Sequence, residues 1–381
     1  MITAFRHGRI VTAQGLVHGQ NVLCADGRIL GLVSDDAVPS AALNVDLDGG
    51  VLMPGYLDVQ VNGGGGVLFN DEPTVEGLRA IARAHAAFGT MGLMPTIIST
   101  DIASIAKAIA AVDEAIVQKV PGILGIHIEG PYLSPKRRGI HNAKAFTPLD
   151  DDALSVLCSL KHGKTMVTLA PDAVPLAAVA VLVAAGVIVC IGHSDASYEQ
   201  TRAVLHAGAR GFTHLFNAMS PLLTRAPGVV GAALDDCDSW CGIISDGHHV
   251  HPAALRVAYA CRGTEKLMLV TDAMPPVGST QKSFVLQGRT IRVENGLCLG
   301  SDGTLAGSAT DMATVVRKGM EFLKVRDFTL AAKLSSSNAA AFLGLGEEVG
   351  VIAAGARADF VLVDDTFNLQ RSFIGGIVLD A

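Results

Sequence analysis

The chain has 381 residues, half of them hydrophobic, with 42 glycines and a formal net charge of −7. This length suits one large domain, or a large domain with a small one. The acidic balance and the lack of a long basic run exclude nucleic acid and anionic membrane surfaces as expected partners. No apolar leader is visible, and charge, Gly or Pro interrupts every apolar stretch before about 18 residues. We therefore expect a cytoplasmic protein without a transmembrane helix.

Both ends of the chain have the pattern of short strands and turns. Residues 1–54 contain "RHGRIVTAQG" and "NVLCADGRILGLV", and the C-terminal end returns to this style with "ADFVLVDD" and "IGGIVLDA". Each end alone is too short to bury a core. We therefore predict that residues 1–54 and 336–381 together form one small β-sandwich domain.

The middle of the chain, residues 55–335, alternates apolar strand-like runs with Ala-rich helical runs. Helices are predicted, for example, over 75–89, 174–186 and 197–209. Eight such β/α units over about 250–300 residues are typical of a (β/α)8 barrel of the TIM type. The eight predicted strands are 51–59, 92–98, 122–130, 165–170, 186–194, 211–217, 241–247 and 267–273.

Ionisable residues stand where four of these strands end. Glu129, His193, His214 and Asp272 each follow an apolar run, and barrel enzymes place their active sites at this end of the strands. Two imidazoles and a carboxylate make a three-ligand metal set that leaves a position open for water. An aspartate nearby can take a proton from that water. A lone buried histidine is more often a core residue, but three such residues at equivalent strand ends favour a metal site.

Several longer motifs carry a resemblance. The segments "GIHIEGPYLSPKRRGIHN", "GHSDAS", "THLFNAMSP", "DGHHV", "LVTDAMPPVG" and "GTLAGS" occur in this order. Together they resemble the N-acetylglucosamine-6-phosphate deacetylases of the amidohydrolase superfamily, over nearly the whole chain. The resemblance implies hydrolysis of N-acetyl-D-glucosamine 6-phosphate to D-glucosamine 6-phosphate and acetate. In a cell, this reaction would serve amino-sugar catabolism and cell-wall recycling.

The resemblance also implies roles for individual residues. Glu129, His193 and His214 would bind one divalent metal ion, expected to be Zn²⁺, although Fe²⁺, Co²⁺ and Mn²⁺ also suit these ligands. Asp272 would be the catalytic acid and base, and His141 would stabilise the oxyanion. A homodimer is expected by resemblance only. The implied substrate contacts are Ile140, His141, Asn217, Ala218, Arg225, Asp246, Gly247, His248, His249, Leu305, Ala306 and Gly307.

Some of these residues have simpler interpretations. Arg225 and His249 suit a phosphate, because guanidinium and imidazole groups donate to its oxygens. Without the resemblance, however, Arg225 reads as a solvated surface arginine, and the alternative interpretation of His248 is that it is only a neighbour of His249. For His127, support of the metal ligands and core packing are equally open.

The segment "DVQVNGGGG", residues 58–66, departs from a pattern found in many metal-dependent hydrolases. Gln60 and Asn62 stand where a His-x-His pair would hold a second metal ion. This resembles family members that lack the pair and hold one ion. The alternative is that both side chains only hydrogen-bond nearby backbone. The glycines provide room for the backbone near the active site and not a phosphate loop, because no Gly-Lys-Ser/Thr follows.

Two other functions stay open at this point. The chain could be another amidohydrolase, acting on a cyclic amide, a dipeptide or a different N-acetyl sugar phosphate. It could also be a sugar-phosphate sensor that kept the barrel without catalysis, although the intact Glu129, His193, His214 and Asp272 set argues against this.

Overall fold

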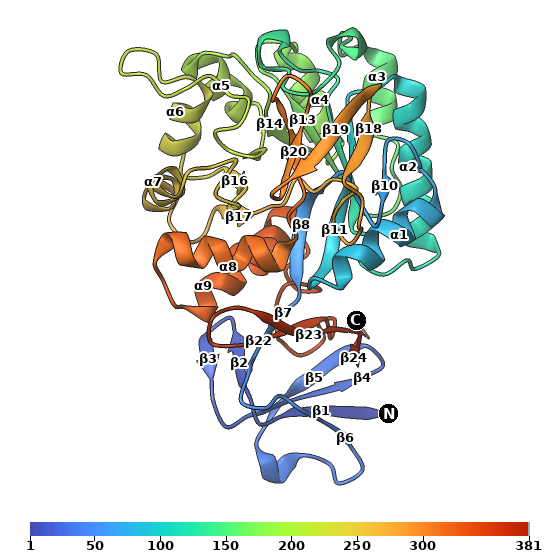
Figure 1. The fold of residues 1–381 in the computed structure, drawn as a ribbon, viewed down its shortest axis with the longest axis vertical. Coiled ribbons are helices and arrows are strands. Elements are labelled where there is room, and N and C mark those ends of the chain that lie inside the picture. Colours follow the sequence, from blue (N-terminus) through green and yellow to red (C-terminus); the bar gives the residue numbers. More distant parts are fainter. Residues whose placement is uncertain (380–381) are drawn as a thin grey trace.

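In the computed structural model, which describes residues 1–379, eight parallel strands form one sheet that curves into a barrel (Figure 1). A parallel bridge between Val61 and Ala273 brings the first and last strands together. The predicted barrel is confirmed. Its strands pair in the order β8 (Tyr56–Val61), β11 (Thr90–Ile98), β12 (Gly125–Glu129), β13 (Lys164–Leu169), β14 (Ile188–Ile191), β15 (Gly211–Phe212), β16 (Trp240–Ile243) and β17 (Leu267–Leu269).

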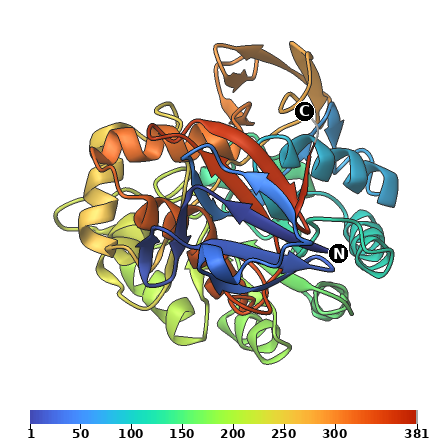
Figure 2. The same ribbon diagram turned by 90° about the horizontal axis from the view of Figure 1, so that it is seen from below.

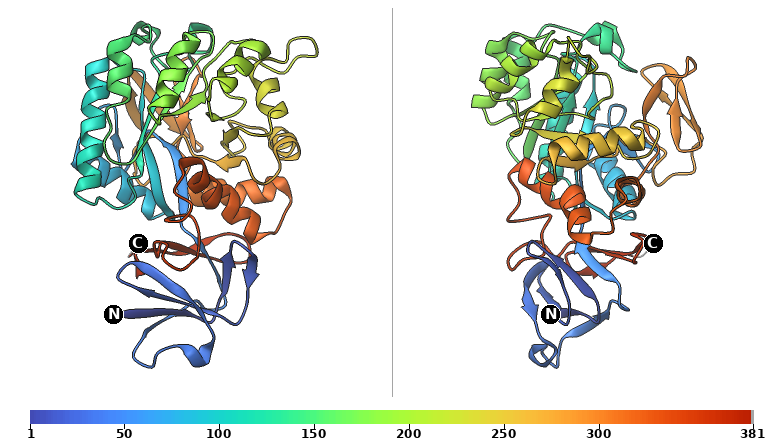
Figure 3. Two further views of the ribbon diagram at one scale, coloured as in Figure 1. Left: turned by 180° about the vertical axis from the view of Figure 1, so that it is seen from behind. Right: turned by 90° about the vertical axis from the view of Figure 1, so that its left-hand side faces the viewer.

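Helices surround this sheet on the outside, as the views in Figure 3 show. Capping side chains mark several of their starts: Thr74 and Asp101 accept hydrogen bonds from backbone N–H groups, and Ser197 forms a capping box with Gln200. The helices are α1 (Val75–Ala86), α2 (Ile102–Val117), α3 (Asp151–Leu157), α4 (Leu176–Ala184), α5 (Tyr198–His206), α6 (Gly228–Asp235), α7 (Pro252–Arg262) and α8 (Met312–Leu323).

Two further sheets lie below the barrel and combine both ends of the chain (Figures 1 and 2). Phe5 packs edge-on against Phe360 and Phe373, so the core between these sheets is also shared. One sheet has the order β5 (Arg28–Val33), β4 (Asn21–Ala25), β1 (Ile2–Arg6) and β6 (Leu43–Asp46). The other has the order β24 (Ile377–Val378), β23 (Leu369–Ile374), β22 (Phe360–Val363), β7 (Val51–Pro54), β2 (Arg9–Thr12) and β3 (Gly15–Val17).

The run 51–59, predicted as one strand, is divided between the two parts of the molecule. Strand β7 pairs with β22 and ends at Pro54, whereas β8 begins at Tyr56 in the barrel. Gly55 lies between them, and a Cβ atom there would be 2.3 Å from the Met91 side chain. The chain can cross from one sheet to the other at this point because the residue is glycine.

The domain boundaries at 54/55 and 335/336 stay predictions. After α8 the chain forms α9 (Phe328–Ala332), a π-helical segment (Lys333–Ser337) and α10 (Asn338–Leu343). Helix α10, which the predicted boundary assigns to the small domain, packs against β8 and β17 of the barrel. Residues 380–381, the end of that predicted domain, lie outside the described residues.

A four-stranded antiparallel sheet that the sequence analysis did not predict is inserted between β17 and α8. It stands against one side of the barrel (Figure 3, right). Its strands are β18 (Ser283–Leu286), β19 (Arg289–Glu294), β20 (Leu297–Leu299) and β21 (Leu305–Ser308). The remaining short elements are β9 (Gly63–Gly64), β10 (Val67–Leu68) and the 3-10 turns Asp35–Ala37, Pro135–Arg137 and Ala143–Ala145. Among residues 1–379, no helix has both the length and the apolar character needed to cross a membrane.

Candidate active site

The four ionisable residues predicted at strand ends lie at the same end of the barrel. Glu129 is the last residue of β12, and His193, His214 and Asp272 follow β14, β15 and β17 within three residues. The last three have φ values of +47°, +33° and +53°, a region that residues other than glycine rarely occupy. Such backbone strain clusters at functional sites, where the surrounding structure holds it in place.

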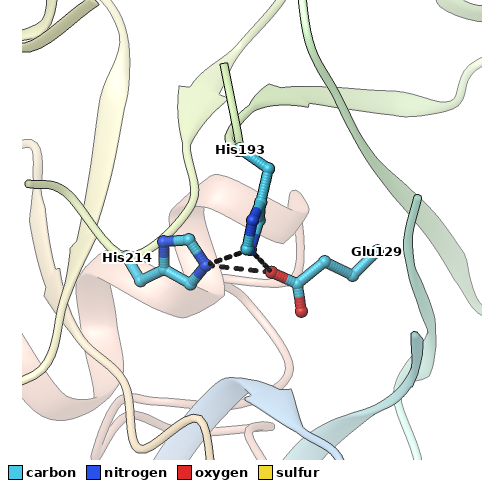
Figure 4. Close-up of side chains that lie close together, drawn as sticks. All are labelled: Glu129, His193 and His214. Atoms are coloured by element: carbon cyan, nitrogen blue, oxygen red, sulfur yellow. Dashed lines mark hydrogen bonds and ion pairs between the residues drawn. The ribbon is translucent and has the colours of Figure 1, made fainter. Parts of the chain in front are cut away.

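Glu129, His193 and His214 converge on one point (Figure 4). The Glu129 Oε1 atom is 2.9 Å from His214 Nε2 and 3.2 Å from His193 Nε2, and the two Nε2 atoms are 3.1 Å apart. The His193 Nδ1–H donates to the carbonyl oxygen of Arg137 at 2.8 Å, which leaves the lone pair of Nε2 directed at the other two residues. Three buried donor atoms that face one another in this way fit a divalent metal ion.

The charges of these residues are strongly linked. Burial by itself would raise the pKa of Glu129, but the adjacent imidazoles of His193 and His214 hold it well below its usual value. Burial likewise disfavours the charged form of His214, yet the hydrogen bond to Glu129 outweighs this and raises the pKa of His214. Glu129 is therefore an anion, as a metal ligand must be.

Asp272 is beside this triad but outside it. Burial, and next the negative charge of Glu129, raise the pKa of Asp272 to about 6. A carboxylate with a pKa near neutrality both accepts and returns a proton with little cost, which suits a general base.

Gln60 and Asn62 both face the carboxylates. Gln60 Nε2 is 3.2 Å from Glu129 Oε2 and 3.1 Å from Asp272 Oδ1, and Asn62 Nδ2 donates to the same Asp272 oxygen at 2.6 Å. The alternative in which these side chains only bond nearby backbone is therefore wrong. The two amides point to the face of β8 that a His-x-His pair would use, and they fix the orientation of Asp272.

His141 reaches the site from the loop that follows β12. Its ring centroid is 4.4 Å from that of His193, and its Nδ1 atom is 2.8 Å from the hydroxyl of Ser99. Burial, and then the nearby imidazole of His193, lower the pKa of His141 to about 3. His141 is thus a neutral imidazole that can hydrogen-bond to a substrate.

A cavity of about 130 Å³ connects these groups. Of the residues implied by the resemblance, eleven line it: Glu129, Ile140, His141, His193, His214, Asn217, Ala218, His249, Asp272, Leu305 and Gly307. Four further lining residues were not singled out as contacts, namely Asn62, Ile98, Gly139 and Met274. Asn62 belongs to the segment that replaces a His-x-His pair, and the other three residues carry no chemical signal in the sequence.

Five residues implied as substrate contacts do not line this cavity. Asp246 is buried behind it and accepts a 2.7 Å hydrogen bond from His249 Nδ1, so Asp246 orients that imidazole. His248 is exposed, and Ala306 is fully buried within the inserted sheet. Gly247 is half-buried, and a Cβ atom there would lie 3.0 Å from the Phe322 ring. Arg225 is exposed on the loop before α6. The roles of these five residues stay predictions.

Two other groups of residues lie next to the site. His127 is fully buried, and its ring nitrogens bond to Thr96 at 3.1 Å and Thr168 at 2.7 Å, so it belongs to a hydrogen-bonded core beneath the triad. Gly65 and Gly66 donate backbone hydrogen bonds to Val277 and Pro275, just beyond Asp272. The glycine segment thus lies directly against the backbone of residues 275–277.

Comparisons with known proteins agree with this geometry. The profile of the Amidohydrolase family matches residues 51–378. An N-acetylgalactosamine-6-phosphate deacetylase of Shewanella sp. (strain ANA-3) is 40% identical over 375 residues, which cover 97% of this chain and 94% of that protein. An N-acetylglucosamine-6-phosphate deacetylase of Haemophilus influenzae is 32% identical, covering 91% and 93%. The crystal structure of N-acetylglucosamine-6-phosphate deacetylase from Pasteurella multocida has a TM-score of 0.96 at 31% identity and covers 100% of both chains.

Proposed function

The chain belongs to the amidohydrolase family, and we propose that it is a metal-dependent deacetylase of N-acetylhexosamine 6-phosphates, with N-acetyl-D-glucosamine 6-phosphate as the first candidate substrate. The products would be acetate and D-glucosamine 6-phosphate. The observation that carries this proposal is the Glu129, His193 and His214 triad with Asp272 beside it in one cavity. Relatives named for this reaction, similar over nearly the whole chain, support it.

The metal would be held by Glu129, His193 and His214, and we propose Zn²⁺. A divalent ion at this position supplies Lewis acidity, which makes water a nucleophile near neutral pH. We further propose one ion per chain, because neutral amides at positions 60 and 62 are poor ligands beside imidazole. We also propose that the protein forms a homodimer and is located in the cytoplasm.

The protein groups divide the chemistry between them. Asp272 takes a proton from the attacking water and later returns it to the leaving amine. Gln60 and Asn62 hold its carboxylate in place through the hydrogen bonds to Oδ1. His141 donates to the acetamide oxygen as negative charge develops there, an interaction that strengthens away from bulk water. His249, oriented by Asp246, contributes to binding of the sugar phosphate together with Asn217, Ala218 and Arg225.

A second candidate substrate is N-acetyl-D-galactosamine 6-phosphate, which differs only in the configuration at C4. The relative at 40% identity carries that name, as does a relative from Escherichia coli O157:H7 at 32% identity over 99% of both chains. Both substrates present the same acetamide and the same phosphate to the residues above. The choice between them therefore depends on contacts with the sugar ring.

The experiment that tests this function measures acetate release from purified protein alongside its metal content. The panel contains both N-acetylhexosamine 6-phosphates, their unphosphorylated forms, a dipeptide and a cyclic amide. We expect turnover of at least one of the two sugar phosphates, with about one metal ion per chain. Turnover of the dipeptide or cyclic amide alone would show a different amidohydrolase, and binding of a sugar phosphate without turnover would show a sensor.

A further inference from the structure

The inserted sheet β18–β21 leaves the barrel shortly after Asp272 and returns through Leu305 and Gly307, which line the cavity. Its inner side chains pack against the loops around the cavity. Leu286, Ile291 and Cys298 form one buried cluster with Ile140 and Met274. The sheet therefore forms one wall over the mouth of the active site, and its position affects the groups below it.

The first hairpin of this sheet has an unusual tip. Strands β18 and β19 are joined by Gln287 and Gly288, whose φ values are +50° and +79°. The next hairpin is joined by Asn295 and Gly296 with nearly the same values, +52° and +82°. Turns of two residues with positive φ favour Asn-Gly, which the second hairpin has. Glutamine is a poor choice for this conformation, and an unfavourable residue at a strained position points to a role for its side chain.

The side chain of Gln287 joins two backbone segments that flank the cavity. Its Nε2 donates to the carbonyl oxygen of Ser99 at 2.6 Å, and its Oε1 accepts from the N–H of Asn142 at 2.8 Å. Because one partner is a carbonyl and the other an N–H group, the orientation of the amide is determined. Ser99 and Asn142 lie far from Gln287 in the sequence, so neither bond is part of the hairpin itself.

Both partners of Gln287 also support His141. The hydroxyl of Ser99 is 2.8 Å from His141 Nδ1, and Asn142 is the next residue in the chain after His141. The Gln287 amide thus anchors the residue that contacts the His141 ring and the backbone that carries it. Residues 142–148, which follow His141, are exposed or half-buried, so little packing restrains this segment.

We propose that Gln287 is a positioning residue, which latches the inserted sheet across the cavity mouth and holds His141 in place for the reaction. The inference rests on the proposed function, in which His141 donates to the acetamide oxygen as charge develops. A displaced His141 would bind the ground state nearly as well but would stabilise the transition state less. Loss of the latch should therefore lower kcat more than it changes KM.

The test compares two single variants of the metal-loaded enzyme. Gln287→Asn gives the first hairpin the favoured turn residue with a side chain one methylene too short to bridge Ser99 and Asn142. Asn295→Gln is the matched control, which places glutamine in the second hairpin without a latch. We expect Gln287→Asn to lower kcat by about 10-fold to 100-fold, with KM changed less than about threefold. We expect Asn295→Gln to keep kcat and to lower the melting temperature slightly.

A second measurement does not depend on turnover. Hydrogen exchange of the segment around Asn142 should become faster in Gln287→Asn and stay as in wild type in Asn295→Gln. Gln287→Glu keeps the acceptor for the Asn142 N–H but cannot donate to Ser99, so its kcat should fall between those of wild type and Gln287→Asn. Wild-type kcat and wild-type exchange in Gln287→Asn would overturn the latch. Inactive wild-type enzyme with faster exchange in the variant would instead reject the proposed substrate and keep the latch.

Discussion

Replacing Asp272 by Asn should remove the base and leave the shape of the site intact. In the structure, Asp272 Oδ1 accepts from Asn62 at 2.6 Å and from Gln60 at 3.1 Å, and the amide oxygen of an asparagine can accept both bonds. The metal-binding atoms belong to the triad and do not include Asp272. We therefore expect kcat to fall by about 10²–10⁴, with about one metal ion per chain still bound. This loss corresponds to about 3–5 kcal/mol of barrier height.

The pH dependence gives a second readout of the same residue. Burial and the charge of Glu129 raise the pKa of Asp272 to about 6, and the base works in its unprotonated form. A divalent cation in the triad would lower this pKa. Activity should therefore be lost as the pH is decreased through the pKa of Asp272, at or below about pH 6. The residual activity of Asp272→Asn should lack this limb. Steady-state rates of acetate release from pH 5 to 8, with metal analysis of both proteins, test the assignment. A variant with near-normal kcat, or one that loses its metal together with its activity, would refute it.

Three further predictions concern residues around the site. Burial raises the pKa of Asp58 to about 7, above its value of about 3.9 in the unfolded chain. The folded state therefore binds this proton more tightly than the unfolded state does. The stability that this proton contributes to the folded state is lost as pH rises from about 4 to 7. Asp58→Asn should therefore gain stability relative to wild type as pH rises, by at most about 4 kcal/mol. Urea unfolding of both proteins at pH 5 and at pH 8 tests this, and an equal difference in stability at the two pH values would contradict it. The double change Gln60→His with Asn62→His should create a second, weaker metal site, and a metal titration in which wild type already binds two ions, or the variant still binds one, would reject this. Arg225→Ala should lower kcat/KM for the phosphorylated sugar by about 10-fold to 100-fold more than for the unphosphorylated sugar, whereas equal losses would make Arg225 structural.

The barrel and the triad could be predicted because their signals are local. The barrel strands are mostly apolar and are buried on both faces, and each ligand stands at or just after the end of such a strand. A metal site at Glu129, His193 and His214 could therefore be predicted without knowing the distances between these residues. Asp272 likewise follows the last barrel strand, so its place beside the triad could be predicted, whereas its role stays a prediction.

Other features depend on contacts between distant segments, which spacing does not reveal. Gln60 and Asn62 could be assigned to one face of a strand. Their hydrogen bonds to Asp272 could not be predicted, because the partners are more than 200 residues apart in the sequence. The inserted sheet was missed although it carries a usable signal. Asn295-Gly296 lies between two alternating segments, which is a strong indication of a hairpin. The latch formed by Gln287 has no signal of this kind, because its partners are backbone atoms.

The pairing of β7 with β22 has a consequence for how the chain is made. During synthesis from the N-terminus, each barrel strand emerges next to a neighbour that is already present, so the barrel can form in the order in which it is translated. Strand β7 instead waits for β22, Phe360–Val363, which follows all of the barrel strands in the chain. Until then one edge of β7 has unpaired N–H and C=O groups, which can attract strands from other chains. Glu129, His193 and His214 thus all precede, in the order of synthesis, the strand that completes the lower sheet.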